Sequence, residues 1–117
     1  MALRCLIVDD SREFLVSARR LLSAQGLEIV GMASSRAEAL RLADQLRPDV
    51  ALLDVQLGED NGVAVARELD RRVPTTRIVL ISTHSREDLA ELIVDSPAVG
   101  FLGKTALSAA AIAELVG

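Results

Sequence analysis

The chain has 117 residues, of which 50% are hydrophobic and 26% are charged, and its formal net charge is −4. This length fits one domain, and the hydrophobic content excludes an intrinsically disordered chain. The acidic balance argues against nucleic-acid binding by this domain, and an aromatic content of 2% argues against a surface that stacks on bases or flavins.

Apolar runs typical of β-strands alternate with helical patterns along the chain. We expect five strands, at residues 3–8, 27–32, 50–54, 77–82 and 98–103. The runs are continuous and rich in Val, Ile and Leu, which is typical of parallel strands buried on both faces of a sheet.

The first two helices have recognisable boundary signals. Ser11 is the expected N-cap of the first helix, which ends at Gly26. Its inward stripe comprises Phe14, Leu15, Ala18, Leu21 and Leu22. Ser35 and Glu38 form a capping box that opens the second helix, and Pro48 follows its end.

Three further helices complete the pattern. The third follows a polar loop at residues 56–62 and ends at Pro74, and Ser85 with Asp88 forms a capping box before the fourth. The last helix, at residues 107–116, is apolar almost all round. This indicates either a contact surface for a partner or a second copy, or simply an alanine-rich composition.

Parallel strands joined by helices through right-handed crossovers form a doubly wound sheet. We therefore predict a single domain over residues 1–117 with an α/β fold, a flavodoxin-like (βα)5 three-layer sandwich with strand order 2-1-3-4-5. Ligands of such sheets bind outside the carboxyl ends of the strands.

Polar side chains follow four of the predicted strands and would meet at that edge of the sheet. They are Asp9 and Asp10, Asp54, Ser82, and Lys104, the only lysine among the 13 Lys and Arg residues. Crowded carboxylates raise one another's pKa unless a cation is present, and their oxygens suit Mg²⁺ or Mn²⁺. The edge is therefore a predicted site for a divalent cation and a phosphoryl group.

Each of these residues has a possible role in phosphoryl transfer and a plainer alternative. Asp54 could be the nucleophile that forms an aspartyl-phosphate, with Lys104 and the metal neutralising charge on the transferring group. The Ser82 hydroxyl could then swing towards the phosphoryl oxygen. The alternatives are surface or capping acids, a surface lysine and a hydroxyl that serves the local backbone. For Thr83 we expect a hydroxyl that serves the local backbone. For His84 we expect an exposed loop position, and its place beside the site leaves a minor influence on an attacking water open.

Phe101 either packs in the core or fills the space that a moving Ser82 vacates, and the sequence leaves both possibilities open. The single Cys5 cannot form an internal disulfide, no apolar run is long enough to span a membrane, and no signal-peptide pattern is present. We expect a cytoplasmic protein that does not bind membranes.

With these residues in place, the chain resembles the receiver domain of bacterial two-component response regulators. The resemblance covers residues 4–116 and rests on four motifs: Val8-Asp9-Asp10, Leu52 to Leu57, Ile81-Ser82-Thr83 and Gly100 to Lys104. The chain departs from the family at Thr105, where proline usually follows the lysine, and at Leu57-Gly58, where Met-Pro is frequent. A cis peptide after Lys104 is therefore left open.

The resemblance implies a phosphorylation-activated switch. A sensor histidine kinase or phosphotransfer protein would phosphorylate Asp54, and Asp9, Asp10, Asp54 and the backbone carbonyl of Gln56 would hold Mg²⁺ or Mn²⁺. Lys104 would contact the phosphate, and Ser82 and Phe101 would be the switch residues.

The resemblance also implies how such a switch would act on other proteins. The fourth helix, fifth strand and fifth helix would form the output face for a homodimer or another protein. The protein would not be an enzyme beyond its own phosphoryl transfer and dephosphorylation. We expect no output domain within residues 1–117, which would be either a stand-alone receiver or a fragment.

Three other classes of protein compete with this interpretation. A flavodoxin-like cofactor binder would need a Ser/Thr/Gly-rich phosphate loop and stacking aromatic residues. A haloacid-dehalogenase-like phosphatase would need Asp-x-Asp after the first strand, where this chain has Asp9-Asp10-Ser11. A receiver fold used constitutively as an interaction module, without phosphorylation, stays open.

Overall fold

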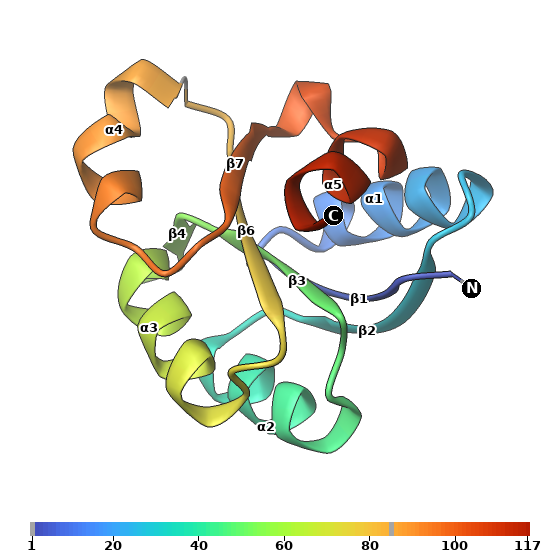
Figure 1. Ribbon diagram of the computed structural model, residues 1–117, viewed down its shortest axis with the longest axis horizontal. Coiled ribbons are helices and arrows are strands. Elements are labelled where there is room, and N and C mark those ends of the chain that lie inside the picture. The colour runs from blue at the N-terminus through green and yellow to red at the C-terminus, as the bar shows by residue number, and fades with distance from the viewer. Residues whose placement is uncertain (1, 85) are drawn as a thin grey trace.

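A five-stranded parallel sheet forms the centre of the protein in the computed structural model, which describes residues 2–84 and 86–117 (Figure 1). Its strands are β1 (Arg4–Val8), β2 (Glu28–Ala33), β3 (Val50–Asp54), β6 (Arg77–Ser82) and β7 (Gly100–Gly103). Their spatial order is β2-β1-β3-β6-β7, and every neighbouring pair is parallel. Because β6 and β7 are the fourth and fifth strands of this sheet, the predicted order 2-1-3-4-5 is confirmed.

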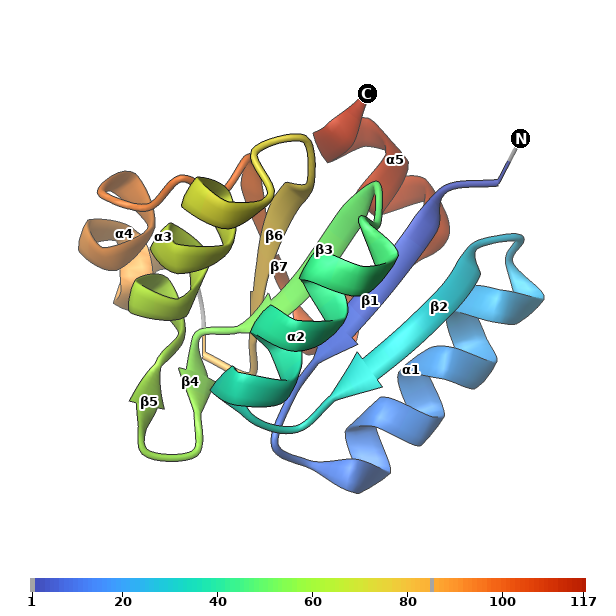
Figure 2. The same cartoon turned by 90° about the horizontal axis from the view of Figure 1, so that it is seen from below.

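Helices cover both faces of the sheet. They are α1 (Arg12–Ala24), α2 (Arg36–Leu46), α3 (Gly62–Arg72), α4 (Arg86–Val94) and α5 (Ala109–Val116), with a short 3-10 turn η1 (Lys104–Ala106). Figure 2 shows α1 and α5 on one side of the sheet and α2 and α3 on the other. The predicted three-layer sandwich is therefore confirmed. Over residues 2–84 and 86–117, no helix combines the length and hydrophobicity that crossing a membrane requires.

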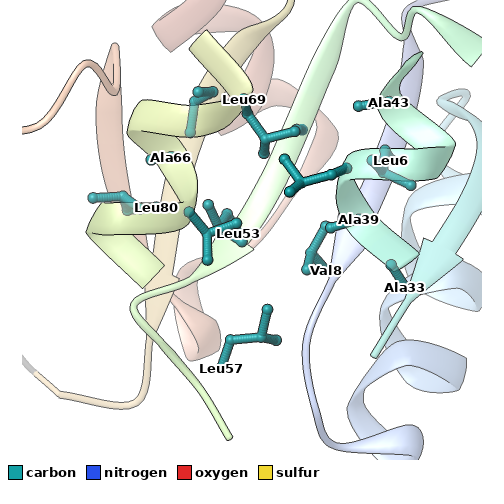
Figure 3. Packing of buried hydrophobic residues seen from close by; sticks show 14 of the residues in the cluster. Leu6, Val8, Ala33, Ala39, Ala43, Leu53, Leu57, Ala66, Leu69 and Leu80 are labelled. Atoms are coloured by element: carbon teal, nitrogen blue, oxygen red, sulfur yellow. The ribbon is translucent and has the colours of Figure 1, made fainter. Parts of the chain in front are cut away.

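Two hydrophobic cores flank the sheet, because successive side chains of a strand point to opposite faces. Along β3, Ala51 and Leu53 pack towards α2 and α3, whereas Val50 and Leu52 pack towards α1 and α5. The first core combines branched strand side chains with small helix side chains, as Figure 3 shows for Leu6, Val8, Leu53, Leu80, Ala39, Ala43 and Ala66. The alanines let α2 and α3 lie close to the strands.

Serine caps begin the first two helices as expected. The Ser11 Oγ accepts a hydrogen bond from the Phe14 N–H at 3.3 Å, and the Ser35 Oγ accepts one from the Glu38 N–H at 3.2 Å. The expected capping box is altered in one respect. The Glu38 carboxylate accepts from the N–H of Ser34, at 2.8 Å, and so reaches one residue further back than the N-cap. The proposed cap at Ser85 lies outside the described residues.

Two features of α1 and the following region differ from the expectations. Leu21 was expected on the inward stripe of α1, but it is 42% exposed while Leu22 is fully buried. Adjacent helical positions diverge by about 100°, so one apolar stripe does not bury both. The expected loop at residues 56–62 contains a short antiparallel ribbon, β4 (Gln56–Leu57) with β5 (Asp60–Asn61), and its last residue is already in α3.

The C-terminal elements begin later than expected, with β7 starting at Gly100 and α5 at Ala109. The intervening turn η1 follows β7 directly and carries Lys104. Lys104, expected directly after the last strand, is therefore the first residue of a helical turn.

Gly62 fixes the loop after β3 by its close approach to the backbone. Its N–H donates to the Val55 carbonyl oxygen at 2.7 Å. A Cβ at this position would lie 2.1 Å from the carbonyl oxygen of Asp54 and 2.6 Å from that of Val55. Both neighbours are backbone atoms, so a side chain here would displace the end of the strand that carries Asp54.

We predict that Gly62→Ala destabilises the fold by about 1–3 kcal/mol, because the added methyl group overpacks against the backbone. Urea unfolding would measure the change. Ala64→Ser, at an exposed position of the same helix, is the matched control and should change stability by less than about 0.5 kcal/mol. Equal unfolding midpoints for the two variants would contradict the prediction.

Candidate functional site

The carboxyl ends of the parallel strands bring four of the predicted residues to one edge of the sheet. Asp9 follows β1 directly, and its N–H continues the ladder by donating to the Ala33 carbonyl oxygen at 3.0 Å. Asp54 and Ser82 are the last residues of β3 and β6, and Lys104 follows β7. Three carboxylates and one ammonium thus converge there when exposed Asp10 is included.

An ion pair between Asp9 and Lys104 lies at the centre of this site. The Lys104 Nζ is 2.5 Å from the Asp9 Oδ2, and the Asp9 side chain is fully buried. The Asp9 Oδ1 accepts a hydrogen bond from the Ser11 N–H at 2.8 Å. Within the described part of the chain, the Asp9 Oδ2 makes no aligned hydrogen bond. The negative charge on this oxygen is therefore compensated by the Lys104 ammonium.

Asp54 is held less firmly by the same lysine. Its Oδ2 lies 3.4 Å from the Lys104 Nζ, and its Oδ1 accepts from the Gln56 N–H at 3.2 Å. Burial raises the pKa of Asp54 and the neighbouring Asp9 charge raises it further, although the Gln56 N–H and Lys104 act in the opposite direction. The site therefore holds more negative charge than one ammonium compensates.

Lys104 stays charged in this environment. Burial alone would lower its pKa, but the contact with Asp9 and the charge of Asp54 outweigh this effect and raise the pKa of Lys104. Its Nζ also lies 4.4 Å from the centroid of the Phe14 ring. The sequence placed Phe14 only on the inward stripe of α1, and its position one turn after the acidic pair was the available signal for this contact.

The three carboxylates form a group that could hold a metal ion. Asp9, Asp10 and Asp54 each offer an oxygen, and these atoms lie within 4.8 Å of one another. The Asp10 Oδ2 accepts a hydrogen bond from the Gly58 N–H at 3.2 Å. This all-oxygen donor set, partly open to solvent, fits a small, hard divalent cation. The expected role of the Gln56 carbonyl as a further ligand stays a prediction.

Ser82 is buried and its hydroxyl is already engaged locally. Its Oγ accepts from the His84 N–H at 3.0 Å and lies 3.4 Å from the His84 Nδ1. This geometry matches the alternative in which the Ser82 hydroxyl serves the local backbone. The movement of the hydroxyl towards Asp54 stays a prediction. Thr83 and His84 are both exposed, and for His84 this was expected.

A cleft of about 230 Å³ opens beside the carboxylates and is bordered by Asp10, Asp54, Ser82 and Lys104.

Phe101 is 8% exposed and belongs to the core on the α2 and α3 side of the sheet. Its packing agrees with the core alternative, and its role in a switch stays a prediction. Among the described residues there is no cis peptide bond.

Comparison with known proteins gives a consistent family match. Residues 5–116 match the family model for the response regulator receiver domain. The chain is 34% identical over 107 residues to a protein-glutamate methylesterase/protein-glutamine glutaminase of Alkalilimnicola ehrlichii, covering 89% of this chain and 27% of that protein. It is 31% identical over 115 residues to the response regulator GacA of Pseudomonas viridiflava, covering 97% and 52%. The chain thus spans from about a quarter to about half of these curated relatives.

Solved structures give the same result. The signal receiver domain of the response regulator NarL from Mycobacterium tuberculosis is similar with a TM-score of 0.86 and 31% identity, covering 98% of this chain and 96% of that one. A response regulator from Burkholderia pseudomallei, described with a phosphorylated aspartic acid, a calcium ion and citrate, has a TM-score of 0.84 and 25% identity. It is covered over 66% of its length, with 98% of this chain.

We predict that Asp54→Asn stabilises the metal-free protein at pH 7 on the order of 1 kcal/mol, the usual scale for single substitutions. The raised pKa of Asp54 means that the folded state holds this proton more tightly than the unfolded state does. Stability contributed by Asp54 is therefore highest when the carboxyl is protonated and falls as the pH rises through its folded pKa.

The advantage of the Asp54→Asn variant should consequently shrink as the pH falls from 7 towards 4. Urea unfolding in the presence of a chelator, at several pH values, would measure it. An advantage that grows on acidification would show that ionised Asp54 is stabilising in the fold, and the stated sign would be wrong.

Proposed function

Since the chain belongs to the response regulator receiver domain family, we propose that it is a phosphorylation-activated signalling switch with Asp54 as its phospho-acceptor. The observation that carries this proposal is the position of Lys104, whose Nζ lies 2.5 Å from Asp9 and 3.4 Å from Asp54. An ammonium in this place can neutralise charge on a phosphoryl group that becomes attached to the Asp54 carboxylate.

The phosphoryl donor would be a sensor histidine kinase or a phosphotransfer protein. An Asp54 carboxylate oxygen forms a bond to phosphorus while the bond from phosphorus to the donor's imidazole nitrogen breaks. The imidazole takes up a proton from water, and the product on Asp54 is an acyl phosphate. Such a transfer needs positioning and charge neutralisation more than acid–base chemistry.

Mg²⁺ or Mn²⁺ would be held by the carboxylates of Asp9, Asp10 and Asp54 and by the Gln56 carbonyl. The donor set fits, because three carboxylate oxygens lie within 4.8 Å of one another beside a partly open cleft. When bound, the cation supplies charge neutralisation at the phosphoryl oxygens. The Burkholderia relative, described with a phosphorylated aspartic acid and a calcium ion, supports the same assignment.

Lys104 and Ser82 would distinguish the two states of the switch. The Lys104 ammonium can shift from Asp9 towards the phosphoryl oxygen without leaving the site, since it already contacts both carboxylates. The Ser82 hydroxyl would leave the His84 N–H and donate to a phosphoryl oxygen. Phe101 lines a second cleft together with Ser82 and Lys104, and its ring would follow into the vacated space.

The face formed by α4, β7 and α5 would carry the signal to a protein partner or a second copy of the chain. Val94 is 80% exposed at the end of α4, and Val99 is 37% exposed before β7. Ala110 and Ala113 are exposed on α5. Residues 1–117 would act as one receiver domain that contacts protein rather than nucleic acid and catalyses only its own phosphoryl transfer and dephosphorylation.

We predict that incubation with acetyl phosphate and Mg²⁺ adds one phosphoryl group to the chain in a hydroxylamine-labile linkage. Intact-mass spectrometry would measure the product. Asp54→Asn should abolish it, and chelation of Mg²⁺ should reduce it strongly. Lys104→Gln should slow its formation by about a hundredfold, the usual scale for losing one stabilising charge or donor in a transition state.

Asp70→Asn, at an exposed acid on α3, is the matched control and should be phosphorylated like the wild type. If the wild type stays unmodified under these conditions, the proposed function fails and a constitutive interaction module becomes the better interpretation. Equal labelling of the Asp54→Asn variant would instead exclude Asp54 as the acceptor.

A further inference from the structure

We propose that Phe14 is a positioning residue for Lys104, holding the ammonium at the carboxylate edge through a cation–π contact. The Lys104 Nζ lies 4.4 Å from the Phe14 ring centroid, inside the distance of about 6 Å at which such contacts are effective. The consequence for phosphoryl transfer rests on the proposed function, whereas the contact itself does not.

The surroundings of the pair strengthen the contact. The Lys104 side chain is only 15% exposed, and Phe14 is half-buried against the core on the α1 and α5 side. Cation–π attraction is greater where water is excluded, because the ring then competes less with hydration of the ammonium. Phe14 therefore lies against the ammonium group that balances the charge of Asp9.

The turn between β1 and α1 holds the ring and the anion together. The Ser11 N–H donates to the Asp9 Oδ1 at 2.8 Å, and the Ser11 Oγ accepts from the Phe14 N–H at 3.3 Å. Lys104 then contacts both Asp9 and the Phe14 ring. Asp9, Ser11, Phe14 and Lys104 are thus joined in a ring of contacts. Ser11, which caps the helix that carries Phe14, also orients the Asp9 carboxylate.

A ring suits this task better than another hydrogen-bond acceptor would. The ammonium has three N–H donors, and an aromatic face attracts its charge without fixing any of them. Lys104 stays free to donate to Asp54 or to a group attached to it.

A second contact steadies the backbone beyond the lysine, since the Gln25 side chain at the end of α1 accepts from the Ala109 N–H at 2.7 Å.

The chain offers a direct test, because Lys104 is its only lysine and selective ¹³C,¹⁵N-lysine labelling gives one side-chain NMR signal set. In the wild type, the ring current of Phe14 should shift the Lys104 ε-CH₂ protons upfield. Phe14→Leu keeps the apolar bulk and should remove the shift, while Phe14→Tyr should retain it. Leu21→Ala, on the exposed side of the same helix, should leave the signals unchanged.

The second measurement is the rate of phosphorylation by acetyl phosphate with Mg²⁺. Phe14→Leu should slow the reaction by about three- to tenfold, the range expected for one partly buried cation–π contact, and Phe14→Tyr should restore it to within about twofold. Urea unfolding of both variants would establish that they are folded under the assay conditions.

Two results would overturn the inference. One is a Lys104 signal that is identical in the wild type and the Phe14→Leu variant, and the other is an unchanged phosphorylation rate in a variant whose signal has moved. A wild type that acetyl phosphate does not modify would refute the proposed function instead. In that case the NMR comparison alone would decide whether Phe14 positions the lysine.

Discussion

The buried contact between Asp9 and Lys104 is the constraint on which the site depends. A fully buried carboxylate is costly without a partner, and here the partner reaches it from the turn that follows β7, far along the sequence. The same ammonium also serves Asp54, at the longer distance of 3.4 Å. The Lys104 ammonium thus lies among three carboxyl groups, so a further positive charge at this site would be electrostatically favourable.

The fold supplies this arrangement through register and close packing rather than through long loops. Parallel strands end at a common edge, and the pairing of β1, β3, β6 and β7 fixes where each polar residue appears. Gly62 then lets the start of α3 approach the backbone after β3, within a distance that any side chain would obstruct. The segment that follows Asp54 is therefore part of the scaffold.

Patterns within single segments and the parallel topology predicted much of this, including the meeting of Lys104 with the carboxylates, whereas other contacts between segments were missed. The strand ends carrying Asp9 and Lys104 were placed correctly because buried runs and parallel topology determine them. The outward position of Leu21 was missed, since both sides of α1 carry leucine. The contact of the Phe14 ring with Lys104 was missed as well, because it depends on the packing of separate elements. For Ser82 the sequence left both a local contact and a switch role open, and the hydrogen bond from the His84 N–H matches the local alternative.

The hydrogen bond from the Gly58 N–H to the Asp10 Oδ2 has a thermodynamic consequence. It anchors the turn between β4 and β5 to the same carboxylate group that a cation would use. A cation held by Asp10 would share this carboxylate with the Gly58 N–H, so binding of the ion would alter the contact that anchors the turn. The ribbon of β4 and β5 would thereby be linked to the ionic composition of its surroundings, and its conformational freedom would report the occupancy of the proposed cation site.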